Sequence, residues 1–168
     1  MGWSSEIAKG ALAGAFSTLV MDLVWFSRYR QGGGEDTFAA WEFATSTTSF
    51  DEAAAPGKVG RRLADAVGIE LADEVAGRTS SVMHWLTGVG YGIGHALLQD
   101  GRGLARAGLT TGAGAFANSY ATLGAMGIYD PIWDYDRETL TEDLTAHVAF
   151  GAATRVAYRV LTDRGDRG

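Results

Sequence analysis

Stretches without charged residues alternate with polar segments along this 168-residue chain. The clearest stretch, residues 79–99, contains no Asp, Glu, Lys or Arg and is bracketed by Arg78 and Asp100. As a helix rising about 1.5 Å per residue, it would be roughly 30 Å long, which matches the hydrocarbon core of a bilayer. This stretch therefore predicts a membrane-spanning helix.

Three other stretches follow the same pattern, at residues 5–30, 105–129 and 139–161. The first of them is interrupted by Asp22, and the last has a charge-free core only about half as long as a spanning segment needs. Together the four stretches predict an all-α fold, a four-helix transmembrane bundle. Its length suits one membrane-embedded domain over residues 1–168.

Residues 31–78 form the long polar loop between the first two predicted helices. Three glycines after Gln31 mark a flexible break, and Pro56 is placed to open a helix. That helix would carry Val59, Leu63 and Val67 on one face and charged residues on the other. The prediction is an amphipathic helix that either lies in the plane of the lipid headgroups or packs over the mouth of the bundle.

Small residues recur at four-residue spacing in the predicted spanning helices, a pattern that lets helices approach closely. The residues expected at such contacts are Gly10, Gly14, Gly88, Gly92, Ala117 and Ala121. The turn between the second and third helices is short, so we expect these two helices to form a tightly packed hairpin.

Every predicted helix carries a polar or ionisable residue at a similar depth. Counted inward from the end of the molecule that holds residues 31–78, these residues lie about 8–15 Å below the membrane interface. They are Asp22, His84, Asn118, Thr122 and His147. Ionisable groups inside a bilayer are costly and face partners or water, so we predict that they form one intramembrane polar site. A second, smaller layer would pair His95 with Arg155, which shares a helix face with Asp143 and His147.

Composition and charge limit the possible partners and chemistry of the chain and indicate on which side of the membrane its termini lie. A net charge of −6 and a pI near 5.0 give no reason to expect a nucleic acid partner. The absence of cysteine excludes disulfides, iron–sulfur ligation and thiol catalysis. Basic residues in the turn at 100–106 and after Arg155, against an acidic segment at 130–143, favour both termini in the cytoplasm.

Three functions fit the predicted site. The preferred one is a bundle without enzymatic activity, accessory or self-associating as a homo-oligomer, whose polar residues hold the helices together. The second is a proton-coupled small carrier or channel, acting as a homodimer, in which Asp22 and His147 exchange protons and His84 relays them. The third is a membrane redox protein with a haem or a transition metal on His84 and His147. No catalytic or metal-binding motif supports an enzyme or a cofactor, so we expect neither.

Four runs of the sequence resemble a class of uncharacterised small multipass membrane proteins of bacteria and archaea and, more distantly, the YagU-like inner-membrane proteins. The runs are GALAGAFSTLVMDLVWFSRYR, HWLTGVGYG, YDPIWDY and DLTAHVAFG. The resemblance touches all four predicted helices but not residues 35–77. It implies an integral protein of a bacterial or archaeal cytoplasmic membrane, with the lipid bilayer as its partner, and it supplies no catalytic residues.

Overall fold

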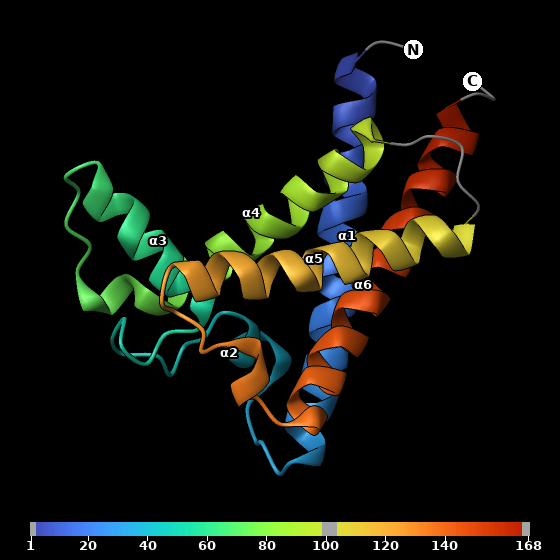
Figure 1. Ribbon diagram of the computed structural model, residues 1–168. Helices are drawn as coiled ribbons and strands as arrows, with labels where there is room; N and C mark the ends of the chain where they lie inside the picture. The colour runs from blue at the N-terminus through green and yellow to red at the C-terminus, as the bar shows by residue number, and fades with distance from the viewer. Residues whose placement is uncertain (1–2, 99–103, 166–168) are drawn as a thin grey trace.

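The computed structural model describes residues 3–98 and 104–165 (Figure 1). Regular structure in this part of the chain is entirely helical, so the predicted all-α class is confirmed. The elements are α1 (Trp3–Gln31), α2 (Phe38–Glu42), α3 (Ala55–Ala66), η1 (Asp73–Val75), α4 (Ala76–Leu97), α5 (Leu104–Ala125), η2 (Ile132–Asp134) and α6 (Arg137–Gly165).

The long helices α1, α4, α5 and α6 fall on the four predicted stretches. The amphipathic helix predicted from Pro56 is α3, with the proline in its first turn. The largest differences from the predicted boundaries are at three helix ends: α4 begins at Ala76, α6 extends to Gly165, and α5 ends at Ala125. Gly127, with a φ of +62°, turns the chain after α5. Gln99, the predicted end of the second helix, lies outside the described residues.

Among the described helices, only α1 is long and apolar enough to cross a membrane by length and hydropathy. A core helix of a soluble protein or a signal sequence would meet the same criterion. The transmembrane character of the four long helices therefore stays a prediction. The start of α1 and the end of α6 lie at the same end of the molecule (Figure 1).

The packing of the long helices differs from the predicted hairpin. α4 packs on α1 and α3, α5 packs on α6, and α1 also packs on α6, whereas α4 and α5 barely touch. The expected hairpin of the second and third long helices is therefore wrong. A short turn makes two helices neighbours along the chain, but the fit of their surfaces decides which helices pack.

Glycine faces fit α1 against α4. A Cβ atom added to Gly10 would lie 2.8 Å from the carbonyl oxygen of Gly92, and one added to Gly14 would lie 2.9 Å from Cα of Val89. A Cβ on Gly92 would likewise lie 2.5 Å from Cα of Gly14, whereas one on Gly88 would meet the side chain of Thr18. The four glycines predicted to pack thus lie at one crossing, where the two backbones are in direct contact.

A second glycine crossing joins α5 to α6, and it differs from the ridge predicted there. Gly108 and Gly112 on α5 face Gly151 on α6. Ala117 and Ala121 are exposed instead, so the expectation that they pack is wrong for this chain alone. The row of α5 that contains Gly112 permits closer approach than the alanine row beside it, because glycine has no Cβ.

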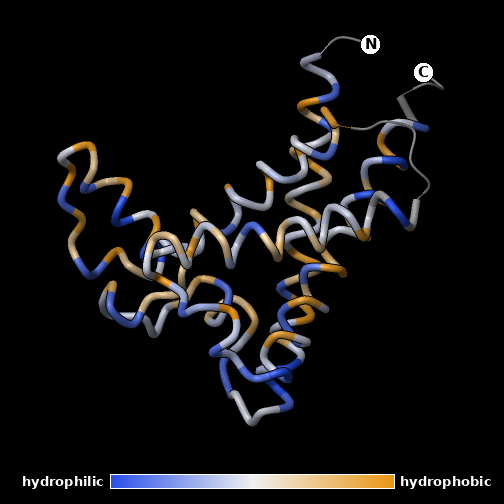
Figure 2. Tube along the Cα trace, viewed as in Figure 1, coloured by the Kyte–Doolittle hydropathy of each residue, from blue (hydrophilic) through white to orange (hydrophobic). Residues whose placement is uncertain are grey.

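Hydrophobic and hydrophilic residues are mixed along the long helices (Figure 2), and several polar side chains are buried while large apolar ones are exposed. The buried polar residues are Ser17, Thr18, Asp22, Ser80, Ser81, His95, His147 and Thr154. Large apolar residues are exposed along the long helices: Leu12, Phe16, Leu23, Val82, Leu86, Leu109, Leu144, Val156 and Val160. Buried hydroxyls donate to carbonyls four residues earlier, as Thr18 does to Gly14 and Thr154 to Phe150, so burial leaves them satisfied.

Replacing Gly92 by leucine tests the first crossing. A Cβ there would lie 2.5 Å from Cα of Gly14, so we expect the free energy of unfolding to fall by about 1–3 kcal/mol. Gly90→Leu is the matched control, because a Cβ at Gly90 meets nothing within 4 Å. Thermal unfolding of purified protein in detergent measures both variants. Equal losses of stability in the two variants would show that the backbone contact does not hold α1 to α4.

Candidate functional site

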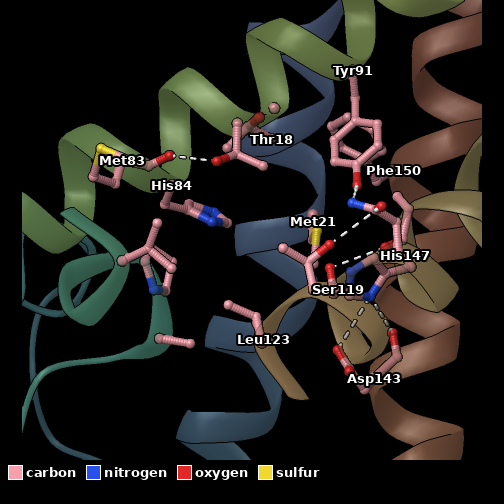
Figure 3. A pocket seen from close by; sticks show the side chains of 18 of the residues that line it. Thr18, Met21, Met83, His84, Tyr91, Ser119, Leu123, Asp143, His147 and Phe150 are labelled. Atoms are coloured by element: carbon pink, nitrogen blue, oxygen red, sulfur yellow. Dashed lines mark hydrogen bonds and ion pairs between the residues drawn. The ribbon is translucent and has the colours of Figure 1, made fainter. Parts of the chain in front are cut away.

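A cavity of about 370 Å³ lies among α1, α3, α4, α5 and α6, and we call it the central cleft (Figure 3). It exists because α4 and α5 are held by different partner helices and leave space between them. Its polar lining comprises Thr18, His84, Thr87, Tyr91, Asn118, Ser119, Thr122, Tyr129, Asp143 and His147. Its apolar lining includes Met21, Trp25, Val59, Met83, Leu123, Met126 and Phe150.

The residues of the predicted polar site gather at this cleft. His84 lines it from α4, Asn118 and Thr122 line it from α5, and His147 lines it from α6. Asp22 of α1 stands behind His84, with its Oδ1 2.7 Å from Nε2 of that histidine. Four of the five predicted residues thus line one cavity and the fifth, Asp22, contacts one of them, while their function stays a prediction.

The Asp22–His84 pair joins α1 to α4. Asp22 is 3% exposed, and its carboxylate holds the histidine ring at the edge of the cleft. Glu42 of α2 lies beside the pair and accepts a hydrogen bond from Nε1 of Trp85 at 2.6 Å. Burial raises the pKa of Glu42 and the charge of Asp22 raises it further, while the Trp85 bond partly offsets this.

The Asp143–His147 pair lies on α6. Nδ1 of His147 is 2.9 Å from the carbonyl oxygen of Asp143 and 3.1 Å from its Oδ1. Both oxygens are acceptors, so Nδ1 carries the hydrogen, and Nε2 of the neutral ring is left as an acceptor. Phe116 packs its ring edge-on against the imidazole, with centroids 5.8 Å apart. Two carboxylate–histidine pairs thus border one cavity.

Three tyrosines pack together beside Asp143. The ring centroid of Tyr120 lies 5.2 Å from that of Tyr129 and 5.4 Å from that of Tyr135. Burial and the charge of Asp143 raise the pKa of Tyr129 to about 12. Its hydroxyl therefore remains protonated near neutral pH and can donate a hydrogen bond at the rim of the cleft.

A single hydrogen bond crosses the cleft between α4 and α5 within the described residues. Nδ2 of Asn118 donates to the hydroxyl of Tyr91 at 2.7 Å, and Oδ1 of Asn118 accepts from Thr122 at 3.4 Å. The side-chain nitrogen of Asn118 therefore bonds to α4 and its oxygen bonds to α5. A second connection runs from α3, where Arg62 donates to the carbonyl of Met126.

The predicted second layer also comes together, apart from the cleft. Nδ1 of His95 lies 2.8 Å from Oγ1 of Thr111, and its ring packs edge-on against Tyr158 with centroids 5.9 Å apart. Arg155 is close enough to interact electrostatically with the His95 ring. Tyr158 donates to Glu6, which also pairs with Lys9. The layer is a polar contact between α1, α4, α5 and α6.

Comparisons with protein-family models, with curated proteins and with solved structures found no match to this chain. The resemblance to YagU-like membrane proteins therefore stays a prediction. In the part of the chain that the structure describes, no three His, Asp or Glu side chains are grouped as ligands for a metal ion. A haem or a metal held by His84 and His147 stays a prediction as well.

Sequence reasoning missed three residues of the site. Asp143 was placed on the face of His147 but not assigned to the site, although its four-residue spacing from His147 was a usable signal. Tyr91 lies about one helical turn from Gly88 and His95, which the sequence pattern indicated. Its hydrogen bond to Asn118 depends on where α5 lies, which the sequence does not show. Glu42 lies in the polar loop, where no periodic pattern indicates that it approaches Asp22.

The raised pKa of Glu42 predicts a pH-dependent stability. The folded protein holds this proton more tightly than the unfolded chain does, so stability declines as pH rises from 4.5 through the raised value. Glu42→Gln keeps an acceptor for Trp85 but removes the titration. We expect its melting temperature to fall less than that of wild type between about pH 4 and pH 7. Glu35→Gln, at an exposed site, is the control and should follow wild type.

Proposed function

We propose that this chain is an integral membrane protein without enzymatic activity, whose central cleft binds a small molecule. The observation that supports the membrane setting is the exposure of large apolar side chains on helices that bury small polar ones. Leu86, Phe16 and Val156 point outward from long helices, while Ser17 and Thr154 are fully buried. Water would penalise this arrangement, whereas lipid accepts apolar outer faces.

The burial of α1 supports the same proposal. Only 33% of its most apolar 18-residue window is buried inside the structure. A core helix of a soluble protein would bury most of such a window, because removing apolar surface from water is what stabilises it there. α1 instead buries its glycines and small hydroxyls and exposes Leu12, Phe16 and Leu23.

The lining of the central cleft supports binding. Small-molecule sites are mostly apolar cavities of about 300–1,000 Å³ with a few convergent polar groups. The cleft has a comparable size, and its polar groups come from α1, α4, α5 and α6 onto walls of Met, Leu, Val and aromatic side chains. The lining holds hydroxyl and histidine side chains, but no catalytic motif surrounds them in the sequence, and the proposal of a non-enzymatic role rests on that.

Proton-coupled carriage is a second candidate, and a specific observation favours it. The Asp22–His84 and Asp143–His147 pairs border the same cavity from opposite halves of the bundle, one on α1 and α4 and the other on α6. Carboxylate–histidine pairs can exchange protons as a ligand enters or leaves.

Cysteine labelling tests the membrane setting, and the chain has no native cysteine to interfere. Leu86 is 59% exposed on α4, and Trp133 is 80% exposed on η2. In open membrane fragments, we expect Trp133→Cys to react with a membrane-impermeant maleimide and Leu86→Cys to react only after denaturation, because lipid covers it. Similar reaction rates for the two positions would show that the helix surface lies in water.

Proton flux tests the second candidate. In liposomes that contain a pH-sensitive dye and carry a potassium diffusion potential, the wild type should conduct protons. Asp22→Asn retains an acceptor for His84 but cannot take up a proton, so its flux should fall to that of protein-free liposomes. Asp130→Asn, in an exposed loop, is the matched control and should conduct like wild type. A wild type without flux, or a variant with undiminished flux, would contradict proton coupling through Asp22.

A further inference from the structure

We infer that the central cleft binds a protonated organic amine with an apolar body. This inference rests on the proposed binding function and specifies its ligand. Asp143 is the one acidic residue in the described lining, which contains no Lys or Arg. A second carboxylate, Asp22, stands directly behind the lining residue His84. A cleft with this charge pattern favours a cation over an anion.

Two arginines approach the cleft without lining it. Arg28 lies over the ring of Trp25 and donates to the carbonyl of Glu142 at 2.6 Å. Arg62 donates to the carbonyl of Met126 from the exposed side of α3. Neither guanidinium group belongs to the lining, so a ligand inside the cleft meets carboxylate and neutral groups but no basic side chain.

The free acceptor atom of His147 indicates which kind of cation the cleft binds. Its side chain is nine-tenths buried and lines the cleft, and Nδ1 is occupied by Asp143. Nε2 is the remaining acceptor of the neutral ring, and no hydrogen bond to it is found among the described residues. An ammonium N–H can donate to Nε2, while the carboxylate of Asp143 compensates its charge through the ring. A quaternary ammonium offers no such hydrogen.

The remaining lining suits the apolar part of an amine. Tyr91 and Phe150 meet edge to face, with ring centroids 6.3 Å apart, and Tyr129 lies near Asp143. Aromatic faces attract a nearby cation and pack against a hydrocarbon group. Met83 and Met126 add flexible apolar surface that adapts to ligand shape. The cavity volume of about 370 Å³ lies in the range of sites for small organic ligands.

Calorimetric titration of the protein in lipid nanodiscs tests the inference near neutral pH, where an aliphatic amine is protonated. Three probes of nearly equal shape separate the contribution of the positive charge from that of the N–H group. They are benzyldimethylamine, benzyltrimethylammonium and the neutral neopentylbenzene. Phenylmethanesulfonate serves as the anion, and empty nanodiscs correct for partition into lipid. We expect saturable one-to-one binding of the tertiary amine, about tenfold weaker binding of the quaternary ion, which lacks the N–H, and no saturable binding of the others.

Variants then locate the site. Asp143→Asn and His147→Phe should each weaken amine binding by about tenfold or more, and His147→Phe should also abolish the preference for the tertiary amine over the quaternary ion. Glu138→Gln removes one charge from an exposed position on the same helix and should leave binding unchanged. Should a variant fail to fold, the comparison of the probes on the wild type still tests whether the ligand is a protonated amine.

Two results would overturn the inference, and they differ in what they leave standing. Equal or tighter binding of the neutral probe, the quaternary ion or the sulfonate would contradict an amine ligand and retain a binding cleft. No saturable binding of any probe would overturn both the amine ligand and the proposed binding function.

Discussion

The direct backbone contact between α1 and α4 is the constraint on which the rest of the structure depends. It exists because Gly10 and Gly14 face Gly88 and Gly92 without side chains between them. Two antiparallel helices held this closely have a fixed register, and two turns beyond Gly14 that register sets Asp22 against His84. The same glycines that let the helices meet therefore determine which polar groups can pair.

The second glycine crossing, between α5 and α6, explains why the molecule has a cleft. The glycines of α4 and α5 that permit the closest approach face α1 and α6, and α4 and α5 make few contacts with one another. The space between them is bridged by the Asn118–Tyr91 hydrogen bond and partly covered by α3. The cavity thus follows from which helices the two crossings join.

The sequence was sufficient for the helices and for much of the site, because both follow from one-dimensional patterns. Charge-free stretches gave α1, α4, α5 and α6, and equal depth along them gave Asp22, His84 and His147. Which face of a helix packs against its neighbour could not be predicted from the sequence. Ala117 and Gly112 belong to neighbouring rows of one helix, and only the shape of α6 decides which row packs. Glu42 is brought to Asp22 by a loop, for which periodicity gives no information.

The two carboxylate–histidine pairs differ in a way that bears on their roles. Asp22 and His84 come from different helices, so interhelical hydrogen bonding accounts for that pair without any ligand. Asp143 and His147 belong to one helix, four residues apart, and the carboxylate of Asp143 also interacts with the hydroxyl of Tyr120 on α5. Partners on both helices therefore satisfy this carboxylate, as a buried charge requires. Of the two pairs, only Asp143–His147 has both side chains in the lining of the cleft, so it is the pair placed to contact a ligand.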